Sequence, residues 1–182
     1  MKHSCKCTQN IIALDVESVL ADIHTSWISH YNKEFTISDI TDWDFISLKK
    51  WDETLESFLD ETDYLWINNA IENIPPTVPN LKEATKHLKP FDIVTSRRTL
   101  GGIIEWIEHH GLEYRAIVYI PDGKTDLDYC MYVDDNPNLA TRLKSNQFLW
   151  LISQPYNQEV EESQQIRRIN SILDVKNPNE LT

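Results

Sequence analysis

The sequence predicts an α/β fold built around a parallel β-sheet, and three features lead to this prediction. The segment NIIALDV, at 10–16, is short, apolar and β-branched, as expected of a strand that is buried on both faces. From residue 80 onward, short apolar segments alternate with segments of helical spacing, which is the order of β-α-β units. With 182 residues, of which 41% are hydrophobic, the chain can bury the core of one domain.

A segment with helical spacing follows the first expected strand. Apolar residues recur every three or four positions from Leu20 to Tyr31, and again more loosely from Leu55 to Ile71. Three prolines between 75 and 79 then interrupt the pattern. We therefore expect a helical insertion at about 23–77, between the first strand and the rest of the sheet.

The chain after these prolines predicts the remaining elements of the sheet. The spacing predicts helices at 80–88, 102–110 and 137–145, and strands at 91–95, 115–120, 129–133 and 147–152. Right-handed crossovers place the carboxyl ends of parallel strands along one edge of the sheet, where α/β proteins bind their ligands. The residues that follow each strand are therefore the candidates for a functional site.

Polar side chains gather at these expected strand ends. They are Asp15, Glu17, Thr95, Ser96, Arg97, Arg98, Asp134 and Asp135, together with Lys124 from the loop PDGKTD. The three aspartates would repel one another unless a cation neutralised them, and Mg²⁺ is the divalent cation that best fits a site of a few carboxylates. Lys124 and the hydroxyl of Thr95 or Ser96 would then donate to phosphate oxygens. This set of groups is typical of a phosphoryl-transfer site.

The polar segments also resemble the motifs of a known superfamily. DVESV (15–19), IVTSR (93–97), GKTD (123–126) and YVDDNP (132–137) occur in the order found in haloacid dehalogenase-like (HAD) phosphohydrolases. Within that superfamily the chain is most similar to the 5′(3′)-deoxyribonucleotidase-like family, over about 11–173. VLADIHTSWISHYN, TDWDF (41–45) and QPYN (154–157) support this closer resemblance.

The resemblance implies a HAD-like Rossmannoid parallel sheet with a small helical cap inserted after the first strand. The core would comprise about 8–22 and 78–182, and the cap about 23–77. It implies a Mg²⁺-dependent phosphomonoester hydrolase acting through an aspartyl-phosphate on a small phosphorylated metabolite, such as a nucleotide. Asp15 would be the nucleophile and Glu17 the acid-base group. Thr95 would bind the phosphate and Lys124 would steady it, while Asp15, Asp134, Asp135 and the backbone carbonyl of Glu17 would hold the metal.

The chain departs from the family pattern at Glu17 and Ser18, where aspartate and glycine are usual. The extra methylene displaces the carboxyl group, and a misplacement of roughly 1 Å can lower a rate about a hundredfold. Ser18 also lacks the conformational freedom of glycine in a tight turn. A catalytically weak or inactive domain that binds a phosphorylated ligand or a protein partner is therefore the alternative to an active phosphatase.

Other polar and aromatic residues have less specific roles. Of the cap aromatics, Trp43 and Phe45 are the candidates for substrate contact, because helical spacing assigns most of the others to the cap core. Arg97 and Arg98 either contact substrate or pair with the acidic cluster or Glu105, and we favour the structural role. QPYN is interpreted as a turn.

Composition bounds the partners and location of the chain. A net charge of −12 argues against binding of a nucleic-acid polymer. No segment has the apolar length of a membrane span, and the polar start lacks the core of a signal peptide. An odd count of three cysteines favours a reducing, cytoplasmic setting, with Cys5 and Cys7 in a tail and Cys130 in the core. The oligomeric state is not predicted.

Overall fold

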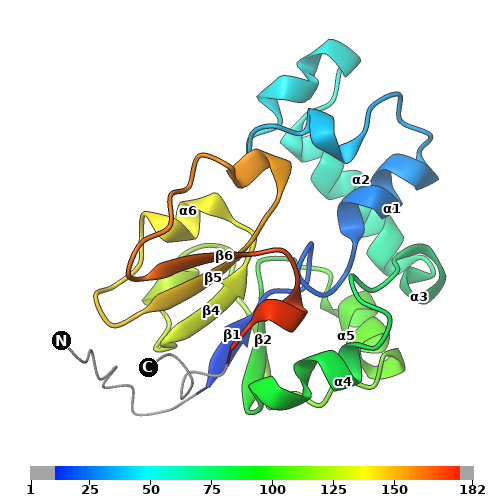
Figure 1. Cartoon of the computed structure of the whole chain (residues 1–182). Helices are drawn as coiled ribbons and strands as arrows, with labels where there is room; N and C mark the ends of the chain where they lie inside the picture. The colour runs from blue at the N-terminus through cyan, green and yellow to red at the C-terminus, as the bar shows by residue number, and fades with distance from the viewer. Residues whose placement is uncertain (1–10, 177–182) are drawn as a thin grey trace.

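A computed structural model describes residues 11–176 and contains a six-stranded parallel sheet (Figure 1). The strand order is β3-β2-β1-β4-β5-β6, so the first strand lies in the centre. The strands are β1 (Ile12–Leu14), β2 (Phe91–Thr95), β3 (Ile117–Tyr119), β4 (Met131–Asp134), β5 (Phe148–Ile152) and β6 (Ile166–Ile169). This arrangement confirms the predicted α/β fold.

Alternate residues of each strand pack into two separate apolar cores, as expected of a sheet covered on both faces. On one face, Ile12, Leu14 and Ile93 pack with the helices that precede and follow β2 and with the helical insertion. On the other face, Ala13 and Val94 pack in a smaller core that includes the helix after β4. The continuous apolar character of the strands therefore reflects burial of both faces.

The helices lie on these two faces and beyond the carboxyl ends of the strands. They are α1 (Ile23–His30), α2 (Leu55–Ile67), α3 (Ala70–Asn73), α4 (Leu81–Thr85), α5 (Leu100–His109) and α6 (Pro137–Ala140). Short 3-10 helices occur at Ile37–Asp39, Ile46–Trp51, Lys86–Leu88, Lys124–Asp126, Pro155–Asn157 and Ile172–Asp174. The elements α1 to α3 all come between β1 and β2, and Figure 1 shows them past the ends to which the strands point.

The sequence did not predict the edge strand β6, whose residues are Ile-Arg-Arg-Ile. Two adjacent arginines interrupt the apolar pattern from which the other strands were recognised. The edge position tolerates them, because Arg168 reaches over the sheet edge and donates to the backbone carbonyls of Asn157 and Val160. The predicted helix at 137–145 was also too long, since α6 ends at Ala140.

Two sequence-based expectations concern cysteines and membranes. Cys130 is buried, as expected, but its sulfur is in a disulfide bond, which the odd number of cysteines did not lead us to predict. Cys5 and Cys7 lie outside the described residues. No helix within 11–176 combines the length and the apolar character needed to cross a membrane.

Helix α5 packs closely against the end of α2, and Gly102 makes this contact possible. A Cβ atom added to Gly102 would lie 1.7 Å from the backbone oxygen of Trp66. The neighbouring Gly101 has nothing within 4 Å of the same position. Next to this contact the buried indole of Trp106 donates to the backbone oxygen of Ile74, at 2.7 Å. The insertion is thus attached to the core through backbone as well as side chains.

The Gly102→Ala substitution tests this close approach. We expect it to reduce the free energy of unfolding by about 3 kcal/mol, because the added methyl group has to displace backbone. For a chain of this size that corresponds to a fall of at least about 6 °C in the melting temperature, measured by circular dichroism. Gly101→Ala is the control and should leave the melting temperature unchanged or slightly raised. Equal effects of the two substitutions would contradict the packing described here.

Candidate active site

A cavity of about 430 Å³ lies between the carboxyl ends of the strands and the helical insertion. Its core side is formed by the ends of β1, β2 and β3 and by the loops that carry Lys124 and Asp135. Its opposite wall comes from α1, α2 and the segment that holds Trp43 and Phe45. Every residue that the sequence singled out for the site lines this cavity except Asp134, which lies behind Lys124.

The buried ammonium group of Lys124 lies between two strand ends. Its Nζ atom is 2.9 Å from Oδ1 of Asp15, which follows β1, and 2.8 Å from Oδ2 of Asp134, which ends β4. Burial alone would lower the pKa of Lys124, but Asp134 and Asp15 outweigh that effect and raise it. Lys124 is therefore a fixed positive charge at the floor of the cavity.

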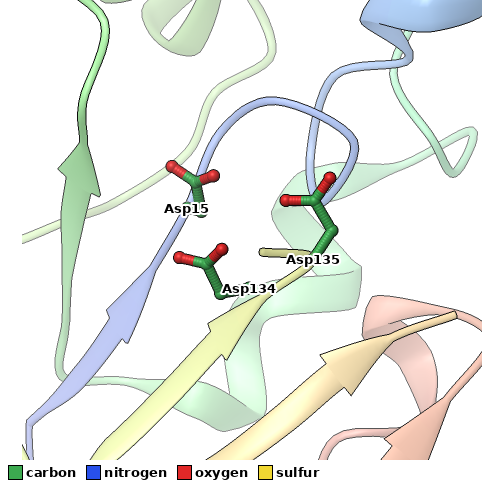
Figure 2. A group of neighbouring side chains, drawn as sticks. All are labelled: Asp15, Asp134 and Asp135. Atoms are coloured by element: carbon green, nitrogen blue, oxygen red, sulfur yellow. The ribbon is translucent and has the colours of Figure 1, made fainter. Parts of the chain in front are cut away.

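Asp15, Asp134 and Asp135 form a buried acidic cluster (Figure 2). Each offers a carboxylate oxygen, and these oxygens lie within 4.8 Å of one another. Burial raises the pKa of Asp15 to about 7, with Lys124 opposing the shift and Asp134 adding to it. Burial, Asp134 and Asp15 likewise raise the pKa of Asp135 well above its usual range. Burial therefore disfavours the charged forms of Asp15 and Asp135.

The donor set of this cluster fits a hard divalent cation. Three carboxylates face one ammonium group, so two negative charges remain when all of them are ionised. Carboxylate oxygens are the ligands that Mg²⁺ prefers, and it keeps other positions for water and phosphate. Two positive charges would balance the cluster and oppose the rise that burial and the neighbouring acids cause in the pKa values of Asp15 and Asp135.

Tyr156 and Asn157, which the sequence led us to interpret as part of a turn, hold Asp135 in place. The buried hydroxyl of Tyr156 donates to Oδ2 of Asp135. The side-chain amide of Asn157 donates to the backbone oxygens of Asp135 and Ile152, at 2.8 Å each. The QPYN segment therefore holds Asp135 in place. The signal in the sequence was that QPYN is one of the segments that carry the family resemblance.

The end of β2 supplies two hydroxyl groups to the cavity. Thr95 is buried, and its Oγ1 accepts a hydrogen bond from the backbone N–H of Arg97 at 3.0 Å. Ser96 is exposed, and both residues line the same cavity as Lys124 and Asp15.

The carboxylate of Glu17 is directed at the helical insertion. Its Oε1 accepts hydrogen bonds from Nη2 of Arg97, at 2.7 Å, and from Nε1 of Trp66, at 2.9 Å. Nη1 of Arg97 also pairs with Asp63 of α2, at 2.9 Å. Arg97 therefore has the structural role that we favoured from the sequence. Its partners are Glu17 and Asp63, and it does not pair with Glu105. Nothing in the sequence pointed to Trp66 or Asp63.

The backbone of Ser18 has the conformation that favours glycine, with φ of 59°. Its hydroxyl is 2.7 Å from Nδ1 of the buried His24, and its backbone N–H donates to the oxygen of Ala21. Burial, together with the charge of Arg97, lowers the pKa of His24 to about 3, so that this imidazole is neutral at physiological pH. The turn is formed despite the serine.

The aromatic residues of the insertion divide as expected between its core and the cavity. Trp27, Phe35 and Trp66 are buried. Trp43 is half-buried at the cavity wall and packs edge-on against Tyr156, while Phe45 lines the cavity at only 3% exposure. The sequence analysis did not single out Phe58 or Tyr119, which also line it. The wall opposite the acids is therefore largely aromatic and aliphatic.

A pair of substitutions at Ser18 separates the backbone strain from the hydrogen bond to His24. Both Ser18→Ala and Ser18→Gly remove the hydroxyl, but only alanine keeps a Cβ at positive φ. We expect Ser18→Ala to be less stable than Ser18→Gly by about 1 kcal/mol in chemical denaturation. Loss of the hydroxyl is expected to cost both variants about 1 kcal/mol. An alanine variant as stable as the glycine variant would show that the turn is unstrained.

Comparisons with known proteins agree with this fold. The family model described as "5' nucleotidase, deoxy (Pyrimidine), cytosolic type C protein" matches residues 9–177. The search of curated proteins found no match.

Two solved structures share the fold. One is L-2-haloacid dehalogenase from Xanthobacter autotrophicus with chloropropionic acid covalently bound, at a TM-score of 0.55 and 8% identity, covering 91% of this chain and 96% of that one. The other is CbbY from Rhodobacter sphaeroides in complex with phosphate, at a TM-score of 0.51 and 9% identity, covering 91% and 95%. The match of the family model over nearly the whole chain means that it belongs to the deoxy (pyrimidine) 5′ nucleotidase, cytosolic type C family, and is a HAD-like phosphatase.

Proposed function

We propose that this chain is a Mg²⁺-dependent phosphomonoester hydrolase that works through an aspartyl-phosphate on Asp15. The observation that carries the proposal is the buried cluster of Asp15, Asp134 and Asp135 around Lys124, at the floor of a cavity whose rim holds Thr95. A phosphate at this position would meet a nucleophile, a cation and a hydroxyl donor within one small volume.

Asp15, Asp134, Asp135 and the backbone carbonyl of Glu17 are the groups proposed to hold Mg²⁺. The metal, when bound, would neutralise negative charge on the phosphate oxygens. Lys124 adds a positive charge that is bonded to both Asp15 and Asp134, so it orients the nucleophile and shares the phosphate charge. Thr95 and Ser96 are proposed to donate to the remaining oxygens.

The proposed reaction has two steps that exchange one proton with Glu17. A carboxylate oxygen of Asp15 attacks the phosphorus while the ester P–O bond breaks, and Glu17 gives its proton to the oxygen that departs as an alcohol. Water then attacks the phosphorus of the aspartyl-phosphate and passes a proton to Glu17. Asp15 and inorganic phosphate are released, and the enzyme returns to its starting state.

We propose a nucleotide 5′-phosphate, with a pyrimidine deoxynucleotide first among the candidates, as the substrate. The description of the matching family supports this choice, and the word cytosolic in it supports a cytoplasmic location. The cavity has room for a small molecule, and Trp43 and Phe45 lie on the wall where a base would have to sit. The net charge of −12 is unfavourable for a polymeric nucleic acid.

The first test compares the wild-type protein with Asp15→Asn in the presence of Mg²⁺. On a panel of nucleotides and other phosphomonoesters, we expect the wild type to release phosphate and Asp15→Asn to lose activity by a factor on the order of 10³ or more. Asp128→Asn, at an exposed position, is the control and should keep full activity. A wild type that binds these esters without turnover would establish the alternative, a binding domain of the same fold.

The second test concerns the support of the metal ligands. Tyr156→Phe removes the donor to Asp135, and we expect it to weaken Mg²⁺ binding about 10- to 100-fold in isothermal titration calorimetry. Tyr129→Phe is the matched control, because the hydroxyl of Tyr129 donates to the buried Asp92, at 2.6 Å. Equal Mg²⁺ affinity in the two variants would refute the role assigned to Tyr156.

A further inference from the structure

We propose that Arg97 and Trp66 are positioning residues that aim the carboxyl group of Glu17 at the leaving group, so that this site requires glutamate where related enzymes use aspartate. The inference rests on the proposed phosphatase function and adds to it the groups that orient its acid. The strand-end residue Arg97 and the insertion residue Trp66 both donate to the same oxygen of Glu17.

The two donors leave the other oxygen of Glu17 for the substrate. Oε1 is 2.7 Å from Nη2 of Arg97 and 2.9 Å from Nε1 of Trp66. Oε2 makes no hydrogen bond with any of residues 11–176, and the Glu17 side chain is 21% exposed at the wall of the cavity. One oxygen is therefore an anchor, and the second remains without a hydrogen bond in residues 11–176, on a side chain that lines the same cavity as Asp15.

Arg97 can act as an anchor because its own position is fixed by helix α2. Nη1 donates to the backbone oxygen of Leu59 and to Oδ1 of Asp63, and Nη2 also donates to Oγ1 of Thr62, all at 2.9 Å. The guanidinium side chain is 3% exposed. A planar guanidinium with this many partners has little freedom to rotate, so the direction of its bond to Glu17 is set by α2.

Trp66 is held equally firmly. Its side chain is 1% exposed and packs edge-on against Trp106, with ring centroids 6.0 Å apart. Its backbone oxygen lies against Gly102 of α5, in the contact that leaves no room for a Cβ atom. Both donors to Glu17 therefore belong to a rigid arrangement that joins the insertion to the core.

The length of the glutamate side chain matches this arrangement. An aspartate at position 17 would be shorter by one C–C bond, about 1.5 Å, so its oxygens would lie roughly 4 Å from both donors. Neither hydrogen bond would form at that distance. The extra methylene thus serves to reach two donors that lie on the insertion side of the cavity.

A positioned acid has a specific kinetic consequence. As the P–O bond to the leaving group breaks, the proton of Glu17 moves to the ester oxygen, which leaves as a neutral alcohol. An alkoxide is a strong base and needs that proton, whereas p-nitrophenolate is stable as an anion and departs without it. Losing the position of Glu17 should therefore slow the first step, release of the leaving group, much more for alkyl phosphates than for p-nitrophenyl phosphate. The second step, in which Glu17 takes a proton from water, is common to both substrates and would slow equally.

The experiment measures the rate of leaving-group release in the first turnover, together with KM, for the wild type, Trp66→Phe, Arg97→Met and Glu17→Asp on a nucleoside 5′-monophosphate and on p-nitrophenyl phosphate. For each variant we expect first-turnover release of the nucleoside to slow about 10- to 100-fold, and first-turnover release of p-nitrophenol to slow less than about threefold. KM for the nucleotide should change little. Glu17→Gln has no proton to donate, so its loss of rate is the largest that a mispositioned Glu17 can produce.

A matched control separates positioning from damage to the insertion. Trp27→Phe also removes a buried indole that donates to a glutamate, in this case Glu61, which lies away from the cavity. It should affect both substrates equally. Trp66→Phe leaves the charge unchanged and keeps an aromatic ring, so it decides the question if Arg97→Met fails to fold. In the Glu17→Gln background, Trp66→Phe should cause no further loss that depends on the leaving group.

The possible results distinguish two failures. If the wild type hydrolyses the nucleotide but Trp66→Phe slows both substrates to the same extent, or Glu17→Asp is as fast as the wild type, the positioning role is wrong and the phosphatase function stands. If the wild type hydrolyses neither substrate in the presence of Mg²⁺, the proposed function fails and the positioning role fails with it.

Discussion

The balance of charge at the strand ends is the constraint on which the rest of this structure depends. Lys124 binds Asp15 and Asp134, which end the two neighbouring strands β1 and β4. Without the lysine, three acids would be buried together with no ion-pair partner among residues 11–176. The central position of β1, the loop that carries Lys124 and the turn that orients Asp135 all serve to bring these groups to one point. The cavity above them is the space that remains for a ligand.

Much of this site could be predicted from the sequence, because its residues follow from local patterns. Asp15, Thr95 and Asp134 each come at the end of an apolar segment, and parallel strands bring such ends together. The edge strand β6 has no such pattern, since its arginines donate to backbone oxygens of the segment that immediately precedes the strand. Tyr156 and Trp66 could not be assigned for a similar reason, because their partners depend on how separate segments pack.

The insertion has two kinds of contact with the site. Its aromatic residues line the wall of the cavity and are suited to an apolar part of a ligand. Its helix α2, in contrast, makes directed hydrogen bonds to Arg97 and Glu17 at the core side. Glu17 and Ser18, the two departures from the family pattern, therefore differ in what they do. Ser18 takes the backbone conformation that glycine would take, whereas Glu17 makes contacts that the shorter residue would not reach.

The contacts of Glu17 also bear on the order in which the parts of the site form during folding. Glu17 is separated along the chain by 49 residues from Trp66 and by 80 from Arg97, whereas only 10 residues separate Lys124 from Asp134. Contacts between distant segments close large loops and form late. Lys124, Asp15 and Asp134 all belong to the core and can assemble with it, while the anchor of Glu17 has to await docking of the insertion, which supplies Trp66. A molecule whose insertion has come loose is expected to retain a place for phosphate but to lose the group that releases the alcohol.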